Sequence, residues 1–489
     1  MGPHPELAEL SAADLSGLLR RGDLTSELLV QMSLDRIEAL DRELTRSVIE
    51  VNPDAIDIAR RRDREARGGK VRGPLHGMPV LVKDNIDTGD RMLTTAGSLA
   101  MTGAPATGDA PLVARLRRAG AVLIGKANLS EWANIRSSRS SSGWSGRGRQ
   151  TRNPHVLDRT PSGSSSGSGA GVAAGFAAFA IGTETDGSII SPANANGVVG
   201  IKPGAGVVSQ AGIIPISRSQ DAAGPMTRSV EDAAAVLGVI AGRAAGYRGR
   251  LKKGALKGKR LGVLREPYTG YSDHTDRCYE RSLAALKECG AVLVEVEMPN
   301  AKELRAGELE KTVLLYELKA GLNEYLRGRK GLAVKTLADV IRWNEAHASD
   351  EMPYFRQELF VEAQATRGLT TMAYVEARHK ARHMAGPEGI DRVMRKHRLA
   401  ALVAPSGAPA SALDVVDGEK HLGGSSQMAA VAGYPIISVP SGSAFGLPLG
   451  LSMFAGAGTE GRLLGFAYAF EQATMARQVP RFLPGLNLP

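Results

Sequence analysis

The sequence is poor in aromatic residues and in cysteine, and it has no long hydrophobic run. Aromatic residues make up 4% of the 489 residues, and the only two cysteines are Cys278 and Cys289. Both lie in one predicted helix, so they indicate neither a disulfide framework nor a CxxC metal site. No stretch approaches the roughly 18 apolar residues of a transmembrane helix. Residues 1–10 lack a signal-peptide core, so the cytoplasm is the default location, although a mature exported chain would look the same.

The charge balance is basic, and much of the excess is local. Hydrophobic residues (43%) and charged residues (23%) are close to globular usage, which excludes a disordered chain or a collagen. The net charge is +10, and nine Lys or Arg with no acid lie between Arg243 and Arg265. We expect this run to be a solvated surface linker. A nucleic-acid-binding protein is the alternative, but no aromatic platform or known binding module accompanies the run.

Glycine is abundant instead, with 58 residues. Residues 162–168 are almost all Ser and Gly, and residues 169–180 are almost all Gly, Ala, Val and Phe. From Thr160 to Pro203 the only charged residues are Glu184, Asp186 and Lys202. This pattern predicts a buried core segment, with a helix of small residues over 169–180, a turn at 181–183 and a shaped loop before the helix.

The rest of the chain alternates between helical and strand patterns, which predicts an α/β fold. Two amphipathic helices are expected within residues 6–50, one beginning at Ser11 and one at Thr25 or Ser26. Further helices are predicted over 109–119, 276–288, much of 301–400 and 467–476. Strands are predicted over 80–82, 121–124, 261–264, 292–296, 401–405 and 435–440.

Three short motif matches do not carry a function. Residues 120–126 have P-loop spacing, but the middle is an apolar strand and Ala127 replaces the Ser or Thr that binds magnesium. His379 and His383 are one helical turn apart without a third ligand, and they are expected to be surface residues. Residues 163–167 fit G-x-S-x-G with Ser165 as nucleophile, but irregular chain precedes them where a nucleophile elbow requires a strand.

A stronger candidate for a catalytic site combines Lys83, Ser164 and Ser188. Lys83 ends an apolar strand, where burial favours the neutral amine that a general base requires. Serine needs such a base to act as a nucleophile. The turn that contains Gly187 can direct consecutive backbone N–H groups at one point and form an oxyanion hole. From spacing alone, a surface lysine and two loop serines remain the alternative.

These segments resemble the amidase signature family over nearly the whole chain. Ser164 and Ser188 are 24 residues apart, as the family signature requires, and the lysine is upstream. Within the family the chain is most similar to bacterial peptide amidases. The matching stretches are 129–134 (LSEWAN), 151–154 (TRNP), 182–188 (GTETDGS), 213–217 (IIPIS), 219–225 (SQDAAGP), 404–410 (APSGAPA) with Lys420 and His421, 432–436 (AGYPI) and 478–482 (QVPRF).

The resemblance implies a fold and a chemistry. The fold is the α/β amidase-signature fold, a large mixed β-sheet core covered by α-helices on both faces. We expect a single amidase domain over 1–489, with a signature core at 60–230, N-terminal helices at 6–50 and a helical region at 301–400 that packs over the core.

The resemblance also assigns the site residues. Ser188 is the nucleophile, Ser164 is the bridging serine after a cis Gly163–Ser164 bond, and Lys83 is the base. The oxyanion donors are the backbone N–H groups of Thr185, Asp186, Gly187 and Ser188. The family uses no metal and no cofactor.

The implied reaction is hydrolysis of a small-molecule or peptide amide through an acyl-enzyme, with release of ammonia from C-terminal carboxamides. The alternative within the family is a general aliphatic or aryl acylamidase, and a non-catalytic basic partner is the alternative from another class. No nucleic acid and no membrane is expected as a partner, and the sequence does not fix the oligomeric state.

The sequence departs from the wider family at three positions. Glu184 stands where the family usually has Asp, Asp186 where it has Gly, and Ile190 where it often has Arg. The peptide-amidase subgroup shares the Glu-Thr-Asp-Gly-Ser version. These departures argue against interpreting the protein as the glutaminase component of a transfer-RNA amidotransferase. The roles of the Glu184 and Asp186 side chains stay open.

Overall fold

The computed structural model describes residues 2–243 and 246–486. One mixed sheet runs through the molecule in the order β1-β3-β2-β4-β6-β5-β10-β11-β9-β7-β8. Its strands are β1 (Val48–Val51), β2 (Pro79–Lys83), β3 (Val122–Ala127), β4 (Phe179–Glu184), β5 (Val199–Lys202), β6 (Ala222–Thr227), β7 (Arg260–Leu264), β8 (Val292–Val296), β9 (Ala401–Pro405), β10 (Ile436–Ala444) and β11 (Leu447–Phe454). Strand β2 is parallel to both β3 and β4, whereas β4 and β6 are antiparallel.

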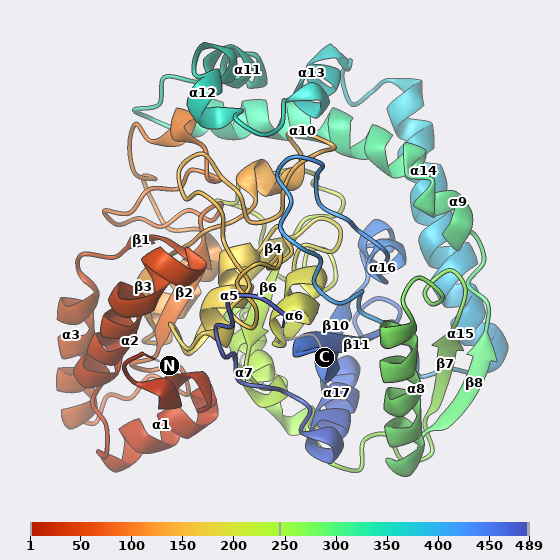
Figure 1. Ribbon diagram of the computed structural model, residues 1–489, viewed down its shortest axis with the longest axis horizontal. Helices are drawn as coiled ribbons and strands as arrows, with labels where there is room; N and C mark the ends of the chain where they lie inside the picture. Colours follow the sequence, from red (N-terminus) through yellow and green to blue (C-terminus); the bar gives the residue numbers. More distant parts are fainter. Residues whose placement is uncertain (1, 244–245, 487–489) are drawn as a thin grey trace.

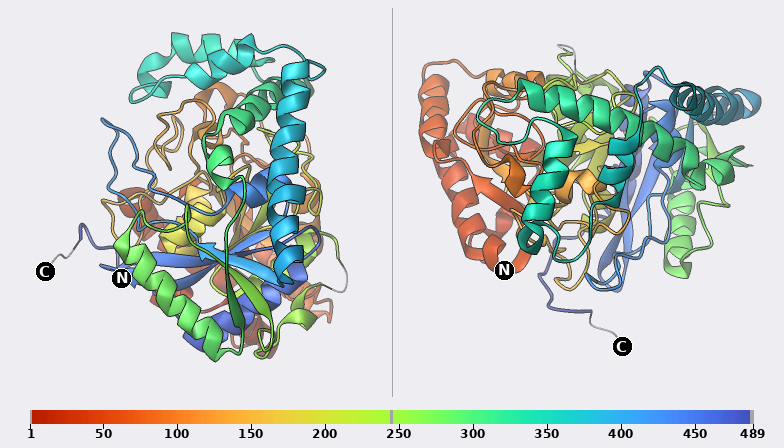
Figure 2. Two further views of the ribbon diagram at one scale, coloured as in Figure 1. Left: turned by 90° about the vertical axis from the view of Figure 1, so that its right-hand side faces the viewer. Right: turned by 90° about the horizontal axis from the view of Figure 1, so that it is seen from above.

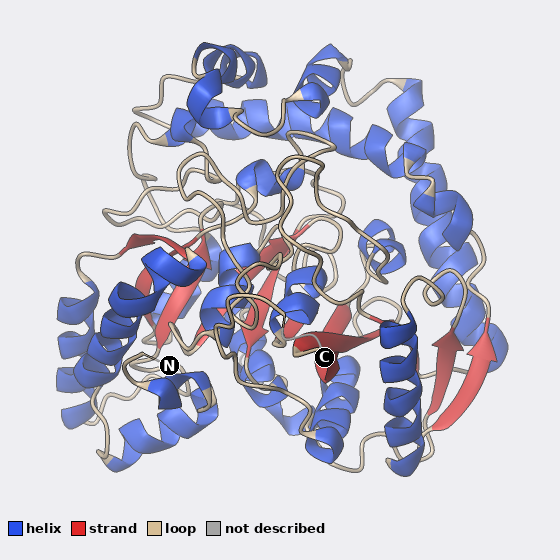
Figure 3. Cartoon of the chain, viewed as in Figure 1, coloured by secondary structure: helices blue, strands red, loops and turns tan. Residues whose placement is uncertain are grey.

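Helices lie against the sheet and extend beyond it (Figures 1 and 3). The first nine are α1 (Ala12–Arg21), α2 (Ser26–Leu40), α3 (Ala55–Arg67), α4 (Pro111–Arg118), α5 (Ser166–Ala173), α6 (Ile190–Asn196), α7 (Val230–Ile240), α8 (Asp273–Glu288) and α9 (Ala301–Arg305). The others are α10 (Glu308–Gly328), α11 (Leu337–Ala346), α12 (Ala348–Glu351), α13 (Glu358–Ala365), α14 (Met372–Ala385), α15 (Arg392–His397), α16 (Gln427–Ala432) and α17 (Glu460–Thr474). The helices from α10 to α14 form an arm along the top and one side of the molecule (Figures 1 and 2).

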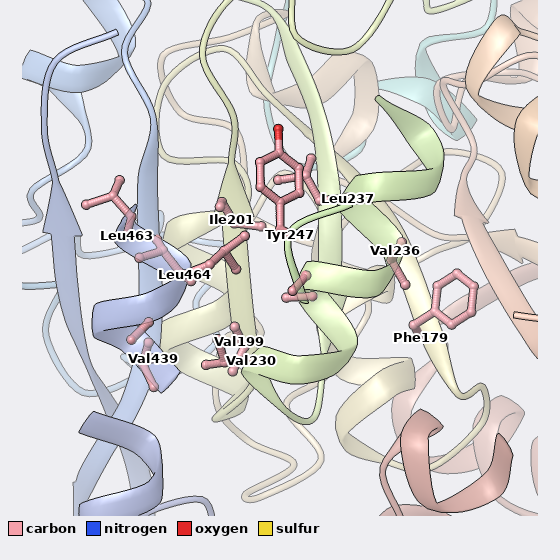
Figure 4. Packing of buried hydrophobic residues seen from close by; sticks show 14 of the residues in the cluster. Phe179, Val199, Ile201, Val230, Val236, Leu237, Tyr247, Val439, Leu463 and Leu464 are labelled. Atoms are coloured by element: carbon pink, nitrogen blue, oxygen red, sulfur yellow. The ribbon is translucent and has the colours of Figure 1, made fainter. Parts of the chain in front are cut away.

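The alternating side chains of β2 pack against helices on both faces of the sheet. Val80 and Val82 belong to the apolar cluster that contains residues of α4, α7 and α17. Leu81 belongs to the cluster that contains residues of α2, α3 and α5. Successive side chains of a strand point to opposite faces, so the two clusters lie on opposite sides of the sheet. Figure 4 shows part of the first cluster, with residues of α7 and α17 packed over β5 and β10. The predicted fold class is confirmed.

Local sequence signals explain several boundaries. Ser11 accepts the N–H of Asp14, and the Asp14 carboxylate accepts the N–H of Ser11, so the two residues form a capping box for α1. Thr25 caps α2 by accepting the N–H of Leu28.

The small-residue segment departs from the expectation. The predicted helix over 169–180 ends at Ala173, and Phe179–Glu184 is strand β4, so the turn expected at 181–183 is wrong. A run of small and apolar residues has no periodicity that separates a buried helix from a buried strand. Strands β1, β5, β6 and β11 were not predicted; β11 contains Pro448 and Gly450, residue types that are uncommon within strands.

Candidate active site

Lys83 lies at the end of β2 and its side chain is fully buried. All five residues of β2 are buried, so the apolar strand carries the amine into the interior. The Nζ atom lies 2.8 Å from Ser164 Oγ, 3.1 Å from Ser165 Oγ and 2.9 Å from Thr183 Oγ1, and it donates to each of them. Lys83 and Ser164 are therefore in direct contact.

Burial controls the charge of this amine. Loss of solvation lowers the pKa of Lys83 to about 7, and the negative charges of Asp221 and Glu184 oppose that shift. A lysine with this pKa has a neutral amine available near neutral pH, which lets it accept a proton. The sequence argument for a displaced lysine agrees with this direction.

The Ser/Gly loop carries Ser164 into the interior beside Lys83. The Gly163–Ser164 peptide bond is cis. A Cβ at position 163 would lie 2.2 Å from Ser130 Oγ, so only glycine fits there. Ser165 stabilises the loop, since its backbone N–H donates to Ser188 O at 3.1 Å and its hydroxyl donates to Thr183 O at 3.0 Å. Residues before Ser165 form no strand, so the nucleophile-elbow alternative lacks its structural context.

Ser188 lies in the turn between β4 and α6. Gly187 in this turn has φ +76°, a conformation that favours glycine. The Glu184 carboxylate accepts the N–H groups of Ile189 and Ile190 at 2.7 and 2.9 Å, which fixes the end of the turn. Among the described residues, the N–H groups of residues 185–188 donate to no acceptor.

One link of the predicted relay is not formed. The Ser188 hydroxyl makes no hydrogen bond to Ser164 or to any other described residue. Catalytic hydrogen bonds are often long without substrate and shorten in the reactive complex. The structure thus brings Lys83 and Ser164 into contact, and it connects the loops of Ser164 and Ser188 through the backbone.

Sequence reasoning assigned no role to Asp221, which supports the same turn. Its Oδ1 accepts the Thr185 hydroxyl at 2.6 Å, and its Oδ2 accepts the N–H groups of Ile216 and Ser217 at 2.9 and 3.0 Å. Burial raises the pKa of Asp221 to about 6. The residue lies in the 219–225 motif, which was the only sequence signal for it.

A second carboxyl contact supports the turn from the other side. Asp186 Oδ1 accepts the hydroxyl of Ser426 at 2.6 Å, and burial together with nearby Glu310 raises the Asp186 pKa well above its usual value. Glu310 of α10 is held by the amides of Gln220 and Gln427 at 2.8 Å each. Residues from the helical arm therefore reach the neighbourhood of the turn that carries Ser188.

A small cavity opens beside Ser164. Its polar lining includes Asn85, Thr183, Thr185 and Asp221, and its apolar lining comes from Ala133, Ile213, Ile214, Ile216 and Ala222. Asn85 Nδ2 donates to Thr183 Oγ1 at 3.0 Å, which connects the lining to the contacts of Lys83. The cavity has room for about one water-sized group beside Ser164.

The discounted motifs have structural explanations. Residues 122–127 form β3, and Lys126 is buried and donates to Ile86 O and Thr94 Oγ1, so the segment is a core strand. His379 and His383 lie on the exposed side of α14 with their rings stacked. Among the described residues, no group of three His, Cys, Asp or Glu side chains is arranged to hold a metal ion. No helix in the described ranges is long and apolar enough to span a membrane.

Comparison with known proteins identifies the family. The sequence model described as Amidase matches residues 28–464. The chain belongs to the amidase family. A crystal structure of native peptide amidase from Stenotrophomonas maltophilia has a TM-score of 0.93 and 50% identity, covering 98% of this chain and 99% of that one.

Two sequence relatives extend the comparison. A probable amidase of Arabidopsis thaliana is 38% identical and covers 98% of this chain and 92% of its own length. A glutamyl-tRNA(Gln) amidotransferase component from Moorella thermoacetica is 34% identical, with 96% of this chain and 97% of that one covered. The predicted family and its similarity to peptide amidases are confirmed, and the chain is an amide-hydrolysing enzyme.

Proposed function

We propose that the enzyme hydrolyses amides through a relay of Lys83, Ser164 and Ser188. The observation that carries the proposal is the 2.8 Å hydrogen bond from the fully buried Lys83 amine to Ser164 Oγ. A buried amine with a pKa of about 7 is a suitable base, and a serine hydroxyl beside it can pass a proton on.

The first half-reaction acylates Ser188. Neutral Lys83 takes the Ser164 proton while Ser164 takes the Ser188 proton, and Ser188 Oγ attacks the amide carbonyl. The C–N bond then breaks, and the leaving nitrogen receives the proton that returns from Lys83 through Ser164. Ammonia leaves when the substrate is a primary amide.

The second half-reaction releases the acid. Water loses a proton through the same relay and attacks the acyl carbonyl, and Ser188 recovers its proton as the ester bond breaks. We assign the backbone N–H groups of Thr185, Asp186, Gly187 and Ser188 as donors to the oxyanion. Their lack of acceptors among the described residues supports that assignment, since preorganised N–H groups stabilise developing negative charge.

For the substrate, we propose the C-terminal carboxamide of a peptide. The 50% identity to a peptide amidase over nearly the whole chain supports this choice. The mixed polar and apolar residues around the small cavity beside Ser164 are compatible with an uncharged amide group there. No metal or cofactor takes part in this mechanism.

We also propose that residues 1–489 act as one catalytic domain. Glu310 of the arm is bonded to Gln220, whose Nε2 also donates to Thr185 O at 3.3 Å. Glu351 of the arm accepts the N–H of Leu99 at 2.5 Å. These contacts couple the helical region at 301–400 to the signature core.

Product analysis tests the substrate proposal. A peptide amide and an anilide that share the same acyl group are supplied separately, and release of ammonia and of aniline is measured. We expect kcat/KM to be higher for the peptide amide. Faster release of aniline would favour the acylamidase alternative. Loss of both activities in Ser188→Ala would tie them to the same nucleophile.

A further inference from the structure

Described residues of the basic run, Arg243 and several residues within 246–260, form one wall of a groove away from the candidate active site. The groove lies where α17 begins, and none of its lining residues lines the cavity beside Ser164. Six exposed cations line it: Arg243, Arg250, Lys259, Arg260, Arg398 and Arg462. Arg398 and Arg462 come from segments far from the run, so folding concentrates more charge here than the sequence alone indicates.

The six cations are not neutralised by neighbouring carboxylates. None of them forms an ion pair with a described residue, whereas Arg248 and Arg265 of the same run are paired with Glu231 and Glu280. Glu460 is the only acidic residue in the lining; it is 1% exposed, and its Oε1 accepts the Gly204 N–H at 3.0 Å. The groove therefore carries a large positive excess, which favours an anion.

Neutral donors accompany these charges. Tyr247 lines the groove and is 6% exposed, and its hydroxyl has no hydrogen-bond partner among the described residues. Figure 4 shows that this hydroxyl points away from the apolar side chains beside the ring. The N–H groups of Glu460 and Gly461, at the start of the 15-residue helix α17, also donate to no described acceptor. Such N–H groups bind phosphate readily.

We propose that this groove binds a small molecule that carries two or more linked phosphoryl groups. Arginine guanidinium groups bind phosphate through paired N–H donors, and several cations around one concave site favour a compact polyanion. The proposal does not depend on the amidase mechanism.

Two macromolecular alternatives fit the groove less well. None of the exposed large hydrophobic side chains lines it, so a membrane would gain little beyond charge contacts. A nucleic acid would be expected to stack bases on exposed aromatic rings, and Tyr247, the tyrosine in the lining, is buried.

Inorganic triphosphate is the probe for a direct test. Binding to the full-length enzyme is measured by titration calorimetry at about 50 mM NaCl, where charge screening is weak. We expect one site per chain and an affinity that falls as salt increases. The double variant Arg250→Gln/Lys259→Gln should bind at least about tenfold more weakly, since it removes two of the six cations.

The matched control is Lys252→Gln/Lys253→Gln, which removes two exposed charges of the same run that do not line the groove. It should change the affinity less than about twofold. Both variants should keep wild-type amidase activity, which verifies folding, and Arg398→Gln replaces the first variant if that one does not fold. Absence of triphosphate binding, or equal weakening in both pairs, would overturn the proposal. Tighter binding to phosphatidylserine vesicles or duplex DNA than to triphosphate would also overturn it.

Discussion

The burial of Lys83 predicts that kcat/KM falls as the pH is lowered below neutral. The amine is fully buried and donates to Ser164 Oγ, Thr183 Oγ1 and Ser165 Oγ. Burial lowers its pKa to about 7, against an opposing effect of the Asp221 carboxylate. Only the neutral amine can take a proton from Ser164, so lowering the pH removes the active form.

The size of the effect follows from that pKa. With a pKa of about 7, roughly nine-tenths of Lys83 is neutral at pH 8, about one-tenth at pH 6 and about one-hundredth at pH 5. We therefore expect kcat/KM to fall about tenfold between pH 8 and pH 6. Asp221 itself titrates near 6. Its protonation removes a charge that favours the ammonium form, so the fall in kcat/KM should become shallower below that pH.

The assay is ammonia release from a peptide amide between pH 5 and pH 9 at constant ionic strength. Initial rates at low substrate concentration give kcat/KM, which reports the free enzyme. Circular dichroism at each pH verifies that the enzyme stays folded. A profile that is flat from pH 9 to pH 5 in folded enzyme would refute the role of Lys83 as base.

Three further predictions concern the site and its support. Ser188→Ala should abolish turnover, and Lys83→Ala and Ser164→Ala should be nearly as damaging, because residues that act as one unit give non-additive effects; a rate like that of the wild type for Lys83→Ala would contradict the relay. Glu184→Gln should lower kcat by about ten- to a hundredfold. The neutral amide is a weaker acceptor for the N–H groups of residues 189 and 190, so the turn that carries Ser188 becomes less rigid. An unchanged kcat would show that the turn does not need this carboxylate. Arg136→Met should destabilise the fold by roughly 1–3 kcal/mol, because it removes a buried guanidinium 3.2 Å from Glu131, a carboxyl whose pKa burial and Glu351 raise well above its usual value, so that it can become neutral; denaturant unfolding measures this loss, and unchanged stability would contradict the buried pairing.

The structure agrees with the predicted burial of Lys83 more closely than with the predicted secondary structure around it. Lys83 was predicted to be buried because it ends an apolar strand, but Lys126 ends a similar apolar run and is also buried. The two differ only in their partners: Lys126 donates to Ile86 O and Thr94 Oγ1, whereas Lys83 donates to Ser164. Partners from distant segments are set by the tertiary fold, so spacing alone did not separate them, and the family resemblance did.

Other features that the sequence did not predict also depend on tertiary contacts or on segments without a distinctive pattern. The boundary between α5 and β4 falls inside an apolar stretch whose helix and strand have the same composition. Asp186 and Glu310 are 124 positions apart, and their proximity depends on how the arm packs on the core. The six-cation groove likewise needs Arg398 and Arg462, which no local pattern connects to the run at 243–265.

Covalent labelling of the nucleophile tests the mechanism most directly. The wild-type enzyme is treated with a serine-reactive fluorophosphonate, digested and analysed by mass spectrometry. We predict one label per chain, on Ser188, and no label in Ser188→Ala. The fraction of activity lost should equal the fraction of Ser188 that carries the label. A label on Ser164 or Ser165, or full inactivation without a label on Ser188, would contradict the assignment of Ser188 as the nucleophile.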